Sequence, residues 1–127
     1  MPDDPDFDIP RRPERRYSRH AGLEYEGTTV FSLSPTAVER ADGALDELLR
    51  TVLDGETYTY GDWFDLPMAL YLVHDSRTGD VFRVSVRDGA IEFHVLPDTD
   101  PGGLRALYRR LVERSECGWS VERRTEY

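Results

Sequence analysis

The sequence contains no lysine, so all 16 of its basic residues are arginines. It has a single cysteine, Cys117, which excludes an intramolecular disulfide and a cysteine-based metal cluster. No apolar run is long enough to cross a bilayer, and the first residues are acidic rather than basic and apolar as in a signal sequence. We therefore expect a soluble, cytoplasmic protein with no membrane partner.

Motifs for catalysis, metals and cofactors are also missing. No serine lies in a Gly-x-Ser-x-Gly elbow, and Gly102-Gly103 lacks the preceding strand and spaced glycines of a nucleotide-binding loop. His74 and His94 have no third convergent ligand for a metal. We predict no catalytic residue, no metal and no cofactor, and we expect the protein not to be an enzyme.

The length of 127 residues and the 39% hydrophobic content are sufficient for one domain with one core. The net charge of −9 argues against a general nucleic-acid-binding surface, because phosphate contacts require a basic field. In composition, the lysine-free, aspartate-rich and arginine-rich sequence resembles proteins of salt-loving archaea and, less specifically, of high-GC bacteria.

Residues 1–20 are rich in proline and in clustered charge, with acids first and five arginines over residues 11–19. We predict a disordered, solvated tail here, followed by a single domain over residues 21–127. The alternative is an arginine arm that reaches a phosphate group or an acidic partner. Contact with nucleic acid is therefore expected, if at all, only through this tail.

Residues 68–96 predict a three-stranded antiparallel meander. Asp88-Gly89 suits a two-residue type I′ turn, in which both residues need a positive φ. This turn sets Val84 opposite Phe93 on one face and Arg83 opposite His94 on the other, because side chains alternate along a strand. The strand at 68–73 is apolar on both faces, which predicts a central strand covered on both sides.

Two amphipathic helices are predicted, at about residues 35–53 and 101–116, each beginning at an acid or serine followed by proline. Residues 23–33 predict a strand, which we place beside 68–73, and residues 119–123 predict an edge strand. The pattern indicates an α+β fold with one antiparallel twisted sheet of about five strands and both helices packed on one face.

The second face of the sheet is the predicted functional surface, because it mixes apolar and charged residues. The interface candidates on and beside it are Met68, Leu70, Leu72, Val81, Leu96, Arg83 and Arg87. The ligand-binding candidates are Trp63, Arg83, Glu92 and His94. Trp63 either seals the core or forms a lip over a pocket, and the whole face is alternatively covered by a helix or by the N-terminal tail.

These features predict a small, non-catalytic binding or regulatory domain that contacts a protein partner through its sheet face, possibly as a homodimer. The alternative is a small-molecule sensor or an enzyme that uses Arg83, Glu92 and His94, since a histidine beside a carboxylate and an arginine is suited to acid–base chemistry on an anion.

Overall fold

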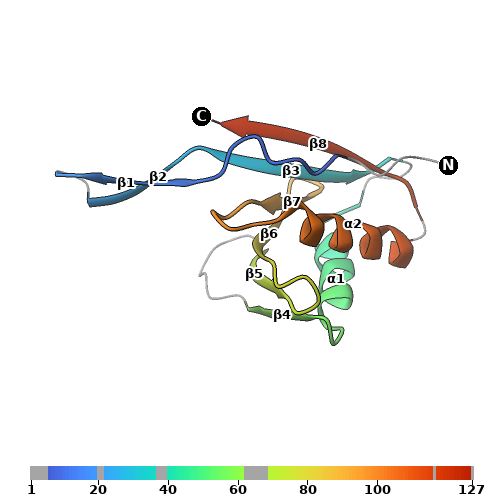
Figure 1. The fold of residues 1–127 in the computed structure, drawn as a ribbon. Coiled ribbons are helices and arrows are strands. Elements are labelled where there is room, and N and C mark those ends of the chain that lie inside the picture. Colours follow the sequence, from blue (N-terminus) through green and yellow to red (C-terminus); the bar gives the residue numbers. More distant parts are fainter. Residues whose placement is uncertain (1–5, 20–21, 37–39, 62–68, 116, 127) are drawn as a thin grey trace.

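The structure is a computed structural model that describes residues 6–19, 22–36, 40–61, 69–115 and 117–126. These residues form eight strands and two helices (Figure 1). The strands are β1 (Glu14–Ser18), β2 (Gly22–Glu26), β3 (Thr28–Pro35), β4 (Tyr58–Gly61), β5 (Ala69–Asp75), β6 (Val81–Arg87), β7 (Ala90–His94) and β8 (Trp119–Glu126). The helices are α1 (Asp42–Leu53) and α2 (Pro101–Ser115), and neither is long and apolar enough to span a membrane.

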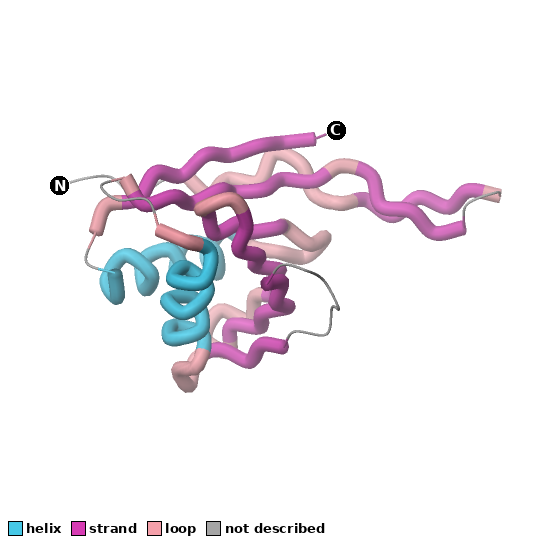
Figure 2. Tube along the Cα trace, turned by 180° about the vertical axis from the view of Figure 1, so that it is seen from behind, coloured by secondary structure: helices cyan, strands magenta, loops and turns pink. Residues whose placement is uncertain are grey.

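Six strands form one antiparallel sheet in the order β4-β5-β6-β7-β3-β8. Both helices lie on the same side of this sheet (Figures 1 and 2). The predicted α+β fold, with a single antiparallel sheet and two helices, is therefore confirmed, with six strands in place of about five. The strands β1 and β2 pair with each other in a separate two-stranded sheet.

The strands β5, β6 and β7 form the predicted meander. The residues of the Asp88-Gly89 turn have φ values of 54° and 75°, the positive values that a type I′ turn requires. Val84 lies opposite Phe93 in the second hairpin, and Val73 lies opposite Phe82 in the first. The register of the second hairpin matches the sequence prediction, so the assignment of its residues to the two faces of the sheet is confirmed.

The hydrophobic core lies between the sheet and the helices. Three leucines from each helix are completely buried in it, namely Leu45, Leu49, Leu53, Leu104, Leu107 and Leu111. They pack against the apolar face of the sheet, which contributes Phe31, Leu33, Phe82, Val84, Ile91 and Phe93. The leucines recur every three or four residues, so each helix buries one continuous stripe.

The position of β3 differs from the prediction. A strand over residues 23–33 is predicted beside β5, whereas β3 lies between β7 and β8, and the short strand β4 occupies the position beside β5. Residues 23–33 are also divided into two strands at Gly27, which has a φ of 80°. Local sequence patterns identify strands but not their neighbours, because strand order depends on contacts between distant residues.

The first helix also begins later than predicted. Ser34-Pro35 has the pattern of a helix start, but it ends β3 and pairs with Ser120 and Trp119 of β8. Helix α1 begins at Asp42, after Ala41, which makes no side-chain capping hydrogen bond. Proline is tolerated at the end of a strand, where the ladder needs no further N–H donor. The second helix, α2, lies within one residue of its predicted range.

The N-terminal segment differs most from its predicted character as a solvated tail. The Phe7 side chain is completely buried, and its ring centroid lies 5.1 Å from that of Phe31 and 5.6 Å from that of Tyr108. Arg123 of β8 holds the same segment by donating to the carbonyl oxygen of Asp8 at 3.3 Å. The chain around Phe7 therefore packs on the helix side of the sheet, where one buried ring outweighs a polar composition.

Candidate functional site

The sheet face that points away from the helices carries most of the predicted site residues. Arg83 on β6 lies opposite His94 on β7 and also opposite Leu72 on β5. In the next row of the sheet, Ser85 lies between Glu92 and Leu70. Apolar and charged side chains are therefore adjacent on one face of the sheet, where the sequence predicted the functional surface.

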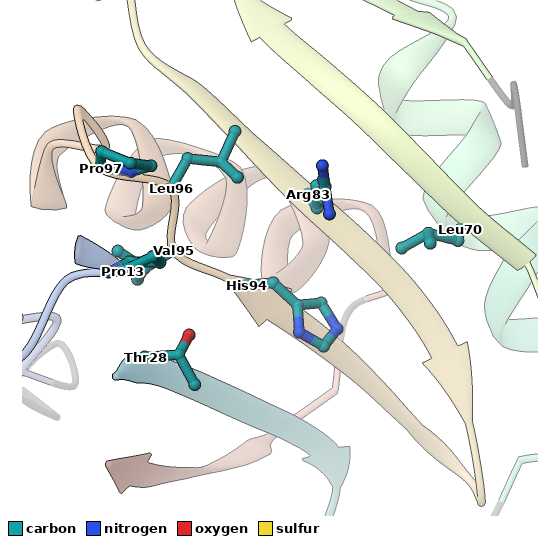
Figure 3. Close-up of a pocket in the computed structure, with 8 residues that line it drawn as sticks. All are labelled: Pro13, Thr28, Leu70, Arg83, His94, Val95, Leu96 and Pro97. Atoms are coloured by element: carbon teal, nitrogen blue, oxygen red, sulfur yellow. The ribbon is translucent and has the colours of Figure 1, made fainter. Parts of the chain in front are cut away.

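This face contains a hollow with a volume of about 430 Å³. It is lined by Pro13, Thr28, Leu70, Arg83, His94, Val95, Leu96 and Pro97 (Figure 3). The close-up places the His94 ring near the centre of these residues, between Leu70 and Thr28. Four of the predicted candidates, Leu70, Arg83, His94 and Leu96, thus come together around one concave site.

The His94 imidazole is held by a buried serine. Its Nε2 lies 2.8 Å from the hydroxyl oxygen of Ser85, whose side chain has no exposed surface. Burial lowers the pKa of His94, because the imidazolium form would lose its hydration. The nearby Glu92 carboxylate opposes this shift, and three nearby guanidinium groups add to it. The ring is therefore held neutral at pH 7 and is oriented by Ser85.

Glu92 is a buried charge with two arginine partners. Its side chain is 6% exposed, and its two carboxylate oxygens lie 3.3 Å from Arg87 Nη2 and 3.4 Å from Arg124 Nη2. Both arginine side chains are about half exposed, so the ion pairs are partly hydrated on the outer side. Because an uncompensated carboxylate is costly to bury, the two arginines explain how Glu92 is accommodated on this face.

No family model, curated protein or solved structure was found to match this chain. What the site can do chemically follows from its own geometry.

The local charge around His94 is opposite in sign to that of the whole chain. Arg83, Arg87 and Arg124 surround His94 with three positive charges, and Glu92 provides one negative charge. The chain as a whole has a net charge of −9. A positively charged region beside an apolar wall favours a ligand that combines an anionic group with an apolar body.

The pairing of Ser85 with His94 resembles a nucleophile and its general base in distance, but not in accessibility. Ser85 is completely buried in the middle of the sheet, where β5 and β7 flank its strand on both sides. Its hydroxyl has no exposed surface, whereas a catalytic serine must contact the reacting carbon. The hydrogen bond is therefore suited to orienting His94 rather than to nucleophilic attack.

The remaining predicted residues lie around the hollow or outside the described part of the chain. Leu72 and Val81 are half-buried beside it, and Arg87 is exposed near Glu92. Met68 and Trp63 fall within residues 62–68, which the structure does not describe. Among the residues that are described, no group of three or more histidine, cysteine, aspartate or glutamate side chains is placed to hold a metal.

Sequence reasoning missed four lining residues, Pro13, Thr28, Val95 and Pro97, and one charged residue nearby, Arg124. Pro13 falls in the predicted tail, and Thr28 and Arg124 lie on strands whose neighbours were predicted incorrectly or not at all. Pro97 follows β7 directly and carries no signal of its own. A correct strand order would have identified two of them, because β3 lies beside β7 and β8 lies beside β3, which brings Thr28 and Arg124 to the same face as His94.

Proposed function

We propose that the chain is a non-catalytic binding domain whose sheet-face hollow receives a small ligand with an apolar body and one anionic group. The observation that carries this proposal is the hollow itself. Its volume of about 430 Å³ lies within the roughly 300–1,000 Å³ of typical ligand sites. Leu70, Leu96 and Pro97 supply an apolar wall, and Arg83 and His94 supply polar groups on the same concave surface.

The anionic group follows from the charges. Arg83 lies within the hollow, and Arg87 and Arg124 lie near enough to His94 to influence its ionisation. An anion placed against Arg83 would gain a charge-assisted hydrogen bond and the field of the other two guanidinium groups. A cationic ligand would be repelled by these guanidinium groups. A purely apolar ligand would remove water from them without replacing the lost hydrogen bonds.

Contact with a protein partner through the same face is the second candidate. Leu72 and Val81 support it, because they extend the apolar surface beyond the rim of the hollow and are only half-buried. The side chains of Leu70, Leu72, Val81 and Leu96 are all half-buried, however, and among the described residues the large hydrophobic side chain that is exposed is Tyr17. A concave, partly enclosed site therefore supports a small ligand more strongly than a flat protein contact.

The test compares two fluorescent probes that share one aromatic body. Anilinonaphthalene sulfonate carries an anionic group, and N-phenylnaphthylamine lacks it. We expect the folded protein to bind both, with the sulfonate tighter. Arg83→Gln is expected to weaken sulfonate binding by about tenfold and to leave the neutral probe unchanged. Leu96→Ser is expected to weaken both probes, because it shortens the apolar wall.

The control is Arg77→Gln, which removes an exposed arginine at the β5–β6 turn, away from the lining of the hollow. Cooperative urea unfolding of every variant must accompany the titrations, because anilinonaphthalene sulfonate also binds partly folded chains. Equal affinity for the two probes, unchanged by Arg83→Gln, would refute anion recognition. Failure of the folded protein to bind either probe would refute the ligand site and leave the protein-contact candidate.

A further inference from the structure

The hollow on the sheet face is lined by polar side chains from three strands. They are Thr28 on β3, Arg83 on β6 and His94 on β7. Figure 3 shows one ring nitrogen of His94 turned toward β6 and the other turned toward Thr28, across the hollow. The nitrogen on the β6 side is Nε2, because it contacts Ser85 of that strand. Nδ1 is therefore the ring nitrogen that a bound ligand would meet.

The Ser85 hydroxyl is the hydrogen-bond donor in its contact with His94. Ser85 is completely buried, and its Oγ lies 2.8 Å from His94 Nε2. Among the described residues this hydroxyl has no other hydrogen-bond partner. A buried donor without an acceptor costs about 1–3 kcal/mol, so the hydroxyl hydrogen is directed at Nε2 rather than left unpaired.

This hydrogen bond determines which ring nitrogen of His94 carries the proton. Burial lowers the pKa of His94, so the ring is neutral at pH 7, and a neutral imidazole has one N–H donor and one acceptor nitrogen. Because Nε2 is the acceptor toward Ser85, the proton lies on Nδ1. Within the described part of the chain Nδ1 has no hydrogen-bond partner, and it is not among the polar atoms buried without one. The hollow therefore presents an N–H donor.

The charges beside this donor match an anion that carries one negative charge. The lining residues that the structure describes include one arginine, Arg83. Arg87 and Arg124 instead lie 3.3 and 3.4 Å from the carboxylate oxygens of Glu92. A carboxylate has one charge and two coplanar oxygens, so it can accept from a guanidinium and from a second donor together. A phosphate monoester carries about 1.5–2 negative charges, more than one lining arginine offsets.

We propose that the ligand of the hollow is a carboxylate with an apolar body, and that His94 recognises it by donating a hydrogen bond from Nδ1. Ser85 is the positioning residue, because it holds the ring in the tautomer that has this donor. The inference rests on the proposed function, since it requires an anionic ligand in the hollow. An alkylammonium head group would place its own N–H donors against the Nδ1–H group and is therefore rejected.

The first measurement is nitrogen NMR of the histidine rings at about pH 8, where histidine is neutral. Protonated and unprotonated ring nitrogens have different chemical shifts, and the His94→Asn spectrum identifies the signals of His94. We expect Nδ1 to be protonated in the wild-type protein. Ser85→Ala removes the donor to Nε2 and should shift the ring toward a mixture of the two tautomers, a change that lost packing alone would not produce.

The second measurement is calorimetric titration of the full chain with octanoate, and with octylamine for comparison. Asparagine places its amide nitrogen as many bonds from Cα as Nδ1, whereas glutamine places its amide nitrogen as far away as Nε2. His94→Asn should therefore keep octanoate affinity within about threefold, and His94→Gln should weaken it about tenfold. His74→Gln is the control, because His74 is exposed on β5 and does not line the hollow. Octylamine should not bind.

The outcomes separate this inference from the proposed function. A proton on Nε2 of His94 in the wild-type protein, or equal octanoate affinity in His94→Asn and His94→Gln, would overturn the role of His94 alone. Binding of anilinonaphthalene sulfonate without binding of octanoate would overturn the carboxylate but leave an anion site. Failure of the folded protein to bind octanoate and both fluorescent probes would refute the proposed function as well. Every variant must unfold cooperatively in urea for its affinity to be compared.

Discussion

Replacing Phe7 by alanine tests whether the N-terminal segment belongs to the folded domain. The ring is completely buried among Phe31, Phe93 and Tyr108, with centroid distances of 5.1, 6.2 and 5.6 Å. Truncating a buried phenylalanine costs about 3–5 kcal/mol, from lost apolar burial and from the cavity left behind. For a chain of 127 residues this corresponds to a fall in Tm of roughly 10–20 °C.

The assay is urea unfolding followed by circular dichroism, supported by calorimetry. We expect the midpoint to fall while the slope stays unchanged, because the variant should expose the same surface on unfolding. Asp8→Ala is the control: it changes an exposed side chain next to Phe7 and should alter the free energy of unfolding by less than about 0.5 kcal/mol. A similarly small effect of Phe7→Ala would refute the packing described above and restore the solvated tail.

Three further predictions concern α2 and the site. Gly103→Ala should destabilise the fold by about 1–3 kcal/mol in the same urea assay, because the added Cβ would lie 2.2 Å from Asp80 Oδ2. Gly102→Ala is the control and should be neutral or stabilising, because the nearest atom to its added Cβ lies at 3.4 Å. Burial raises the pKa of Asp80, so its contribution to stability is complete below the unfolded value of 3.8 and is lost as pH rises through the folded pKa. Asp80→Asn should therefore become more stable relative to wild type between about pH 3 and pH 7, and a constant difference in urea midpoints would contradict this. The pKa of His94 is lowered in the folded protein, so the unfolded chain takes up the proton first and the free energy of unfolding falls as pH drops below 6.5. His94→Gln should weaken this pH dependence of stability, which urea titrations at several pH values would measure.

The part of the site on β6 and β7 could be predicted from sequence, because one short turn determines the register of these two strands. The Asp88-Gly89 turn admits a two-residue loop, and such a loop fixes which residues of β6 and β7 face each other. A slip of one residue would have moved Phe93 to the hollow and His94 into the core, so the hydrophobic pattern reinforces the turn. For this reason the residue pattern alone assigns Arg83, Glu92 and His94 to the face that they share in the fold.

The parts that sequence did not predict depend on contacts between distant residues. The position of β3 beside β7 is decided by packing over more than 50 residues of chain, and no local pattern records it. Phe7 lies among prolines and acids, so its composition predicts a solvated segment, although a single ring fills a space between β3, β7 and α2. Ser34-Pro35 has the local pattern of a helix start, but in the fold these residues continue β3 and pair with β8.

The hollow lies at the base of the hairpin formed by β1 and β2. Pro13 immediately precedes β1, Thr28 follows β2 after Gly27, and both residues line the hollow. A ligand that contacts them therefore contacts the base of the β1–β2 hairpin, and Arg12 ties that base to the carbonyl oxygen of Pro97, which also lines the hollow. If a ligand in the hollow stabilises this base, a change that stabilises the base must strengthen ligand binding by the same factor, because coupling between linked equilibria is reciprocal.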